Sequence, residues 1–177
     1  QYGIDRDQAE RIRITSEGLF DALESPWNLS EEDRHMLIWG AMLHEIGLQI
    51  NYSGFHRHGA YILGNTPLPG FNREQQDVLA TLVRLHRKRL DLAAIPQLRH
   101  WSKDRIVKLI RILRIATVMR IGRHDKPRPE YQVKSDGEVL QLRFDANALK
   151  HHPVMTLDLQ DEVKRQADAG LRLELVS

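Results

Sequence analysis

The strongest constraint on the fold is a helical spacing of apolar residues that persists over about the first 125 residues and then stops. Each periodic segment begins near a residue whose side chain can cap a helix N-terminus: Asp5, Ser30, Ser53, Asn72 or Ser102. The helices expected from this spacing occupy 5–23, 30–47, 53–63, 72–88 and 102–121. A chain with this pattern is predicted to form a helical bundle.

Two of these helices carry further expectations. The run from Trp39 to Gly47 is almost entirely apolar, which predicts a central, buried helix that Gly47 closes. In the last helix, the apolar side chains as far as Ile121 are expected to face inward, and the Arg and Lys side chains to face solvent.

After Glu130 the spacing changes to the alternation of β-strands. The elements expected there are a hairpin with strands near 131–133 and 139–144 around a turn at 135–137, further short strands at 154–159 and 171–176, and a helix at 161–169. The sequence therefore predicts a mainly α fold, with a helical bundle over residues 1–127 and a small α+β domain over residues 128–177.

Composition excludes several classes of protein. The 177 residues suffice for one ordinary domain, or for one domain with a small appendage. The absence of cysteine excludes a disulfide scaffold, a thiolate zinc site and a cysteine nucleophile. No apolar stretch approaches the length of a membrane helix and the first residues do not resemble a signal region, so a soluble, cytoplasmic protein without a membrane partner is expected. The chain does not begin with Met, which is consistent with a piece of a longer protein.

Charge is segregated along the chain. Residues 1–50 carry ten acidic side chains against four Arg, whereas residues 84–128 carry fourteen Arg and Lys against three Asp, a surplus of eleven positive charges. If this block shares one face of the fold, it would suit a polyanion such as polyphosphate, a nucleotide with several phosphates, or nucleic acid. The alternative is that the basic residues line solvated helix faces and pair with the acidic first helix.

Several histidines fall at predicted helix ends. His44 stands beside Glu45, His56 and His58 flank one arginine, and His86 ends its helix. Imidazoles and carboxylates that converge at such ends can hold a divalent metal for attack on phosphate esters and anhydrides. The alternative is a buried His44 hydrogen-bonded to backbone, with the other three histidines exposed or binding phosphate.

The residues around these histidines resemble a known family. The run Ala41–Gly47 (Ala-Met-Leu-His-Glu-Ile-Gly) resembles the signature of HD-type phosphohydrolase domains. The wider pattern is similar to the C-terminal region of the exopolyphosphatase and guanosine pentaphosphate phosphohydrolase family, on the segments His44–Gly47, Phe55–Leu63, Asn65, Leu68–Phe71 and Arg84–Lys88. The resemblance implies an HD-like helical bundle over residues 1–127, followed by the small α+β domain.

The resemblance implies that catalysis in this family is carried out by two N-terminal actin-like lobes, which contain phosphate-binding loops and a catalytic carboxylate. This sequence contains no glycine-rich phosphate loop, so the expected role is the accessory half of the enzyme. It would bind polyphosphate or guanosine pentaphosphate and support a homodimer, and the isolated chain is expected to be inactive. The chain itself would need no cofactor, whereas Mg or Mn is expected in the full-length enzyme.

An active HD domain would have four metal ligands. Placed on this sequence, the first His falls on Arg11, the His-Asp pair on His44 and Glu45, and the late Asp on Thr117. Only His44 is unchanged, so no catalytic or metal-binding residue is expected here. The alternative is an independent metal-dependent HD phosphohydrolase acting on a nucleotide, in which His44 and Glu45 are catalytic and bind metal together with His58 and His86.

The residues expected to bind substrate lie on the loops nearest this degenerate site. They are His56, Arg57, His58, Arg87, Lys88 and Arg89. They would form a basic channel in which guanidinium groups bind phosphate oxygens, with an affinity that falls steeply as salt rises. A second alternative, a nucleic-acid-binding module, rests on the basic block alone and lacks an evident surface of stacking aromatic side chains.

Overall fold

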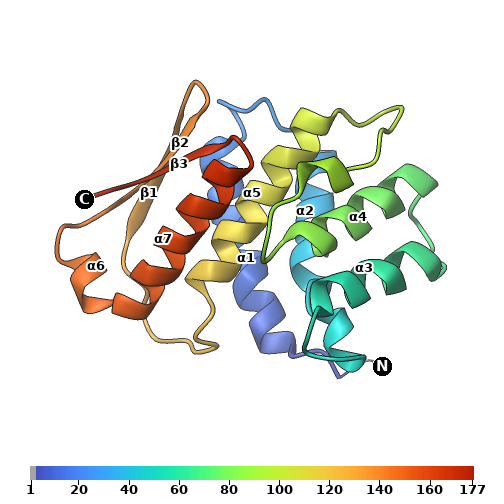
Figure 1. The fold of residues 1–177 in the computed structure, drawn as a ribbon, viewed down its shortest axis with the longest axis horizontal. Helices are drawn as coiled ribbons and strands as arrows, with labels where there is room; N and C mark the ends of the chain where they lie inside the picture. Colours follow the sequence, from blue (N-terminus) through green and yellow to red (C-terminus); the bar gives the residue numbers. More distant parts are fainter. Residues whose placement is uncertain (1–2) are drawn as a thin grey trace.

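Helices fill the first two thirds of the chain in the computed structural model, which describes residues 3–177 (Figure 1). They are α1 (Arg6–Leu23), α2 (Glu31–Leu43), η1 (Ile46–Gln49), α3 (Phe55–Asn65), α4 (Arg73–Leu85), η2 (Leu92–Ala94) and α5 (Lys103–Met119). The predicted caps Asp5, Ser30, Asn72 and Ser102 each accept a hydrogen bond from a backbone N–H in the first turn. The cap predicted at Ser53 is wrong, because α3 begins after Gly54, which is left-handed (φ 68°) and gives no side-chain cap.

The helix predicted over 30–47 ends at Leu43. The chain turns at His44 and Glu45 because η1 packs directly on the backbone of α3. A Cβ at Gly47 would collide with the carbonyl of Phe55 and the amide of Gly59. Most of the segment from Trp39 to Gly47 is buried, as predicted; the exception is Trp39, which is 38% exposed and packs edge-on against Phe71 at the surface.

Helix α5 runs through the middle of the molecule. Its apolar side chains Ile106, Leu109, Ile110, Leu113 and Ala116 are fully buried, as the spacing predicts. Two expectations for this helix are wrong. Ile121 lies beyond its end and is 57% exposed, and Arg111 and Arg114 are buried rather than solvent-facing. These arginines are buried because the last helix of the chain packs against α5.

The C-terminal third forms a small α+β unit, which consists of β1 (Tyr131–Asp136), β2 (Val139–Phe144), α6 (Ala148–His151), α7 (Pro153–Asp168) and β3 (Arg172–Val176). The sheet order is β1-β2-β3, with β1 antiparallel to β2 and β2 parallel to β3. The predicted hairpin is confirmed, with Asp136 opposite Val139 across a turn that contains left-handed Gly137.

The strand predicted at 154–159 is wrong, because these residues belong to α7. The buried positions of α7 are Met155, Leu159, Glu162 and Gln166, which follow the spacing of a helix face. Helix α7 connects the parallel strands β2 and β3, and a helix is the usual form of such a connection.

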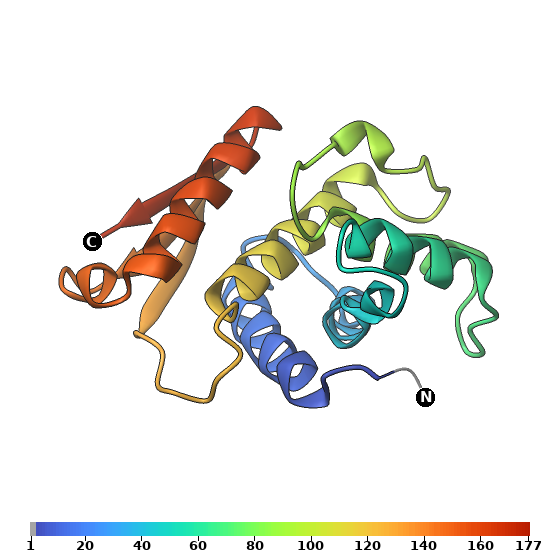
Figure 2. The same cartoon turned by 60° about the horizontal axis from the view of Figure 1, so that its bottom comes forward.

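One hydrophobic core joins the helical part to the sheet. Buried residues of α1 and α5 belong to the same cluster as Leu140, Leu142 and Phe144 of β2. Trp27 adds a polar contact, since its Nε1 donates to Ser135 Oγ of β1 at 2.8 Å. Figure 2 shows α7 and the sheet on one side of α5, with α2, α3 and α4 on the other. The mainly α fold followed by a small α+β unit is confirmed, and a domain boundary at residue 127 stays a prediction. None of the described helices is both long and apolar enough to cross a membrane.

Candidate functional site

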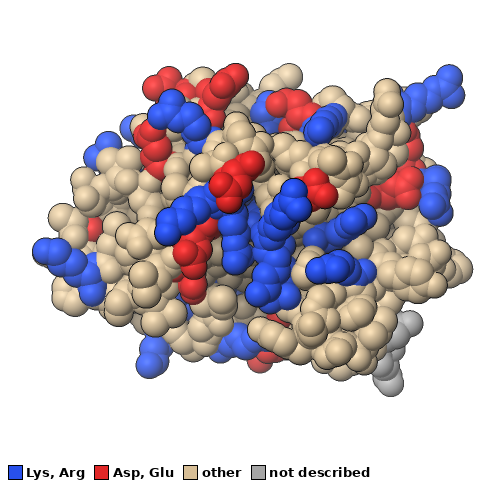
Figure 3. Space-filling view, viewed as in Figure 1, with Lys and Arg blue, Asp and Glu red and all other residues tan. Residues whose placement is uncertain are grey.

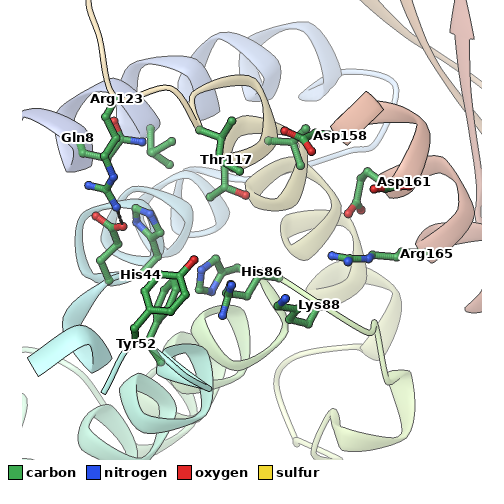
Figure 4. A pocket seen from close by; sticks show the side chains of 17 residues that line it. Gln8, His44, Tyr52, His86, Lys88, Thr117, Arg123, Asp158, Asp161 and Arg165 are labelled. Carbon is green, nitrogen blue, oxygen red and sulfur yellow. Dashed lines mark hydrogen bonds and ion pairs between the residues drawn. The ribbon is translucent and has the colours of Figure 1, made fainter. Parts of the chain in front are cut away.

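A hollow of about 450 Å³ lies where the ends of α2, α4 and α5 meet α7 (Figure 4). The helical part supplies one side of the wall, which includes Gln8, His44, Glu45, Tyr52, His86, Arg87, Lys88, Thr117 and Arg123. Helix α7 supplies the other side with Asp158, Asp161, Glu162 and Arg165. The hollow therefore exists only when the helical part and the α+β unit are packed together.

Two buried histidines form the inner end of the hollow. His44 and His86 directly follow α2 and α4, and their rings are nearly perpendicular with centroids 5.2 Å apart. His44 Nδ1 lies 2.6 Å from the Ala41 carbonyl oxygen, and His86 Nδ1 lies 2.5 Å from the Val83 carbonyl oxygen. Burial lowers the pKa of both rings, so both are neutral at pH 7. Because Nδ1 carries the proton that the carbonyl accepts, Nε2 of each ring is left as an acceptor.

Glu45 is buried beside these histidines and forms an ion pair with Arg123. Arg123 follows α5 in a left-handed conformation (φ 52°) and also binds Asp5 at 3.0 Å. The other carboxylate oxygen of Glu45, Oε1, has no hydrogen-bond partner among residues 3–177. A guanidinium group thus lies directly against the carboxylate of the His-Glu pair.

The positions matched to the HD ligands are not all in the hollow. Arg11 lies outside it and pairs with Asp125 at 2.7 Å, while Gln8, one turn earlier in α1, reaches the wall. Thr117 does reach the wall, and its hydroxyl donates to the Arg114 carbonyl oxygen of its own helix at 2.9 Å. The cation that lies against Glu45 is therefore not Arg11 but Arg123, which follows α5.

The side chains named as alternative metal ligands are only partly brought together. His44, Glu45 and His86 share the wall, but His58 does not, since its Nε2 lies 3.0 Å from the Ser53 carbonyl oxygen. Within residues 3–177, no three His, Asp or Glu side chains are placed to hold one metal ion. The described residues therefore do not fit a metal centre.

Cations gather at the rim of the hollow. Arg87, Lys88 and Arg165 all reach it, and none has a carboxylate within 4.0 Å among the described residues. The guanidinium of Arg87 stacks 4.3 Å from the ring centre of Phe55 and lies 5.7 Å from that of Tyr52. Figure 3 shows basic side chains gathered at the centre of this face of the molecule.

The other residues expected in a basic channel lie around this rim or away from it. His56 is buried next to Arg87, and burial together with repulsion from that cation lowers its pKa to about 4. Arg89 lines a neighbouring hollow that shares Arg165 with the first. Arg57 lines a separate hollow between α3 and α4. The six predicted residues therefore do not line one hollow.

A buried ion pair joins the basic rim to α7. Arg114 Nε donates to Glu162 Oε2 at 2.8 Å, and Arg114 Nη2 donates to Glu162 Oε1 at 3.0 Å. The same guanidinium donates to the carbonyl oxygens of Leu85 and Lys88, each at 2.6 Å. Leu85 and Lys88 lie on either side of Arg87 in the chain. The ion pair between Arg114 and Glu162 therefore fixes the position of the basic turn after α4 relative to α7. Glu162 is held in turn by Gln166 Nε2 at 2.9 Å.

Sequence reasoning missed the whole contribution of α7. Asp158 and Asp161 face the hollow, and burial together with repulsion from Asp161 raises the pKa of Asp158. Arg165 faces it from the next turn of α7 (Figure 4). The available signal was the spacing of Met155, Leu159, Glu162 and Gln166, in which two polar residues continue an apolar helix face.

Basic and histidine side chains thus gather at the helix ends of a helical unit that a small α+β unit closes, and the comparison with known families identifies the chain as part of a phosphohydrolase. The family model described as Ppx/GppA phosphatase, domain III, matches residues 1–163. The chain belongs to this family and corresponds to its C-terminal region, which confirms the resemblance seen in the sequence.

The curated relatives carry the name guanosine-5'-triphosphate,3'-diphosphate pyrophosphatase. The chain is 34% identical to the protein of Pseudoalteromonas translucida (strain TAC 125) over 176 residues, which are 98% of this chain and 35% of the relative. It is 34% identical to the protein of Pseudoalteromonas atlantica (97% of this chain, 34% of the relative). It is 33% identical to the protein of Aeromonas hydrophila subsp. hydrophila (96% and 34%). The chain thus spans about a third of the length of these relatives.

Proposed function

We propose that this chain binds the phosphate-rich substrate of a phosphohydrolase, either polyphosphate or guanosine pentaphosphate, and does not cleave it alone. The observation that carries the proposal is the convergence of Arg87, Lys88 and Arg165 on one rim without a carboxylate partner in the described part of the chain. Cations that are left unpaired beside a hollow are available for an anionic ligand.

The geometry of the rim favours phosphate. A guanidinium binds two phosphate oxygens at once, and stacking on Phe55 orients Arg87 before any ligand arrives. Arg114 and Glu162 fix the backbone on both sides of Arg87, so little conformational entropy is lost on binding. The affinity would be mainly electrostatic and would fall steeply as salt rises, as it does for other dense polyanions.

Cleavage is proposed to reside in actin-like lobes that this chain does not include, with Mg or Mn bound there. The chain covers about a third of its curated relatives, which leaves room in those proteins for such lobes. Dimer formation through this HD-like region and a cytoplasmic location belong to the same proposal. An independent metal-dependent phosphohydrolase gains no support from the described residues, because they provide no cluster of three metal ligands.

Equilibrium binding of polyphosphate to this chain, at low and at near-physiological salt, tests the proposal. We expect salt-sensitive binding that weakens at least about tenfold in a variant with Arg87, Lys88 and Arg165 changed to Ala. The matched control changes Lys134, Arg143 and Lys150 to Ala, which removes the same charge from exposed residues elsewhere.

Different outcomes would contradict different parts of the proposal. Equal losses in the rim variant and in the control would show that binding is not located at the rim. An absence of binding by the unaltered chain would contradict the binding role itself. Phosphate release by this chain with Mg or Mn would contradict the assignment of catalysis to other lobes.

A further inference from the structure

The inner end of the hollow differs chemically from its basic rim. His44 and His86 are 4% and 3% exposed, and both present Nε2 without a hydrogen-bond partner among residues 3–177. Each Nδ1 is held by a backbone carbonyl, so each Nε2 can only accept a hydrogen bond. Glu45 Oε1, on the same side of the hollow, is a third acceptor without a partner among the described residues, while the other carboxylate oxygen of Glu45 is paired with the Arg123 guanidinium.

A bare phosphate chain does not complement this end. Polyphosphate near neutral pH offers mainly acceptor oxygens, so it leaves both Nε2 atoms and Glu45 Oε1 unpaired. Burying a polar atom without a partner costs binding free energy. A single metal ion does not complement it either, because no three His, Asp or Glu of the described chain can share one ion. The ligand that fits carries hydrogen-bond donors, such as hydroxyl or amino groups.

An exposed aromatic ring stands between these two environments. Tyr52 is 69% exposed, lines the hollow and lies 5.7 Å from the Arg87 guanidinium. Figure 4 shows its ring next to His44 and His86, on the opposite side of the hollow from α7. An exposed ring beside a phosphate-binding cation is suited to stacking on a nucleobase.

We propose that the inner end of this hollow is a nucleoside subsite, in which His44 Nε2 and His86 Nε2 accept hydrogen bonds from a sugar or base whose phosphates lie at the rim. Tyr52 stacks on the base. This inference rests on the proposed function, since it takes the rim as the phosphate site. It makes the hollow selective for a nucleoside polyphosphate over an unsubstituted phosphate chain.

The test compares guanosine triphosphate with tripolyphosphate by calorimetry on this chain at pH 7.5, because both ligands carry three phosphates and differ by the nucleoside. Tripolyphosphate carries more negative charge, so electrostatics alone favours it. We expect guanosine triphosphate to bind at least about tenfold more tightly, which corresponds to one neutral hydrogen bond plus stacking. Adenosine triphosphate then identifies the hydrogen-bond donors. If it binds as tightly as guanosine triphosphate, the donors belong to the sugar; if it binds more weakly, they belong to the guanine base.

Variants locate the effect. His86→Asn keeps a donor for the Val83 carbonyl but has no acceptor at the position of Nε2, and it should abolish the preference without changing tripolyphosphate binding. His86→Gln places an amide oxygen near that position and should keep part of the preference. Tyr52→Leu changes an exposed side chain, so it tests the stacking even if a substitution at buried His86 unfolds the chain.

Failure of this inference is distinguishable from failure of the proposed function. If tripolyphosphate binds as tightly as the nucleotide, or if Tyr52→Leu weakens both ligands equally, the nucleoside subsite is wrong and the phosphate-binding role stands. If neither ligand binds, the proposed function is wrong and the subsite falls with it.

Discussion

Replacing Arg114 with Met tests whether the ion pair between α5 and α7 holds the site together. Arg114 is fully buried and Glu162 is 3% exposed, so the substitution leaves a carboxylate in the interior with Gln166 as its remaining side-chain donor. Breaking a buried ion pair in this way costs about 3–5 kcal/mol. The carbonyls of Leu85 and Lys88 lose their donor as well. For a domain whose total stability is about 5–15 kcal/mol, the loss is large.

The assay is urea unfolding followed by tryptophan fluorescence. Two further variants separate the ion pair from the packing of the side chain. Arg114→Met combined with Glu162→Leu removes both charges, and it should recover at least about 1 kcal/mol relative to Arg114→Met alone. Lys108→Met, on the same helix, breaks an exposed pair with Asp104 and should cost less than about 1 kcal/mol.

Two results would refute this reasoning. One is a cost of less than about 1 kcal/mol for Arg114→Met, which would mean that the carboxylate of Glu162 finds solvent or another partner. The other is a double variant no more stable than Arg114→Met, which would mean that the side chain matters for its packing and its backbone contacts rather than for its charge.

Two further predictions concern stability. Gly47→Ala should unfold the chain or destabilise it by several kcal/mol, roughly the cost of a severe clash in a core. The reason is that the added methyl group meets the backbone of Phe55. A melting temperature within a few degrees of that of the unaltered chain would contradict this prediction. The free energy of unfolding should also fall as the pH drops from about 6.5 towards about 4. The pKa of buried His56 is lower in the folded chain than in the unfolded chain, so in this pH range the proton binds to the unfolded chain and favours unfolding. His56→Gln should make this dependence shallower, and an unchanged slope in thermal unfolding against pH would show that the histidine is solvated.

Local sequence signals predicted much of the fold. Asp5, Ser30, Asn72 and Ser102 mark the starts of four helices because a side-chain cap acts within one turn of chain. The hairpin was predictable for the same reason, since Gly137 supplies the left-handed residue of its turn. The strand predicted at 154–159 failed because a six-residue window does not distinguish a short strand from one face of a helix.

The sequence by itself determined the family, the mainly α class, and the presence of histidines and basic residues at helix ends. Only the tertiary structure decided which of these residues meet. The helical spacing predicts that Arg114 is exposed, but in the fold α7 places Glu162, 48 residues later in the chain, against it. Arg123, rather than Arg11, reaches Glu45 because the chain turns back after α5. Such pairings depend on distances through space between segments far apart in the chain, and capping and periodicity report only on the nearest few residues.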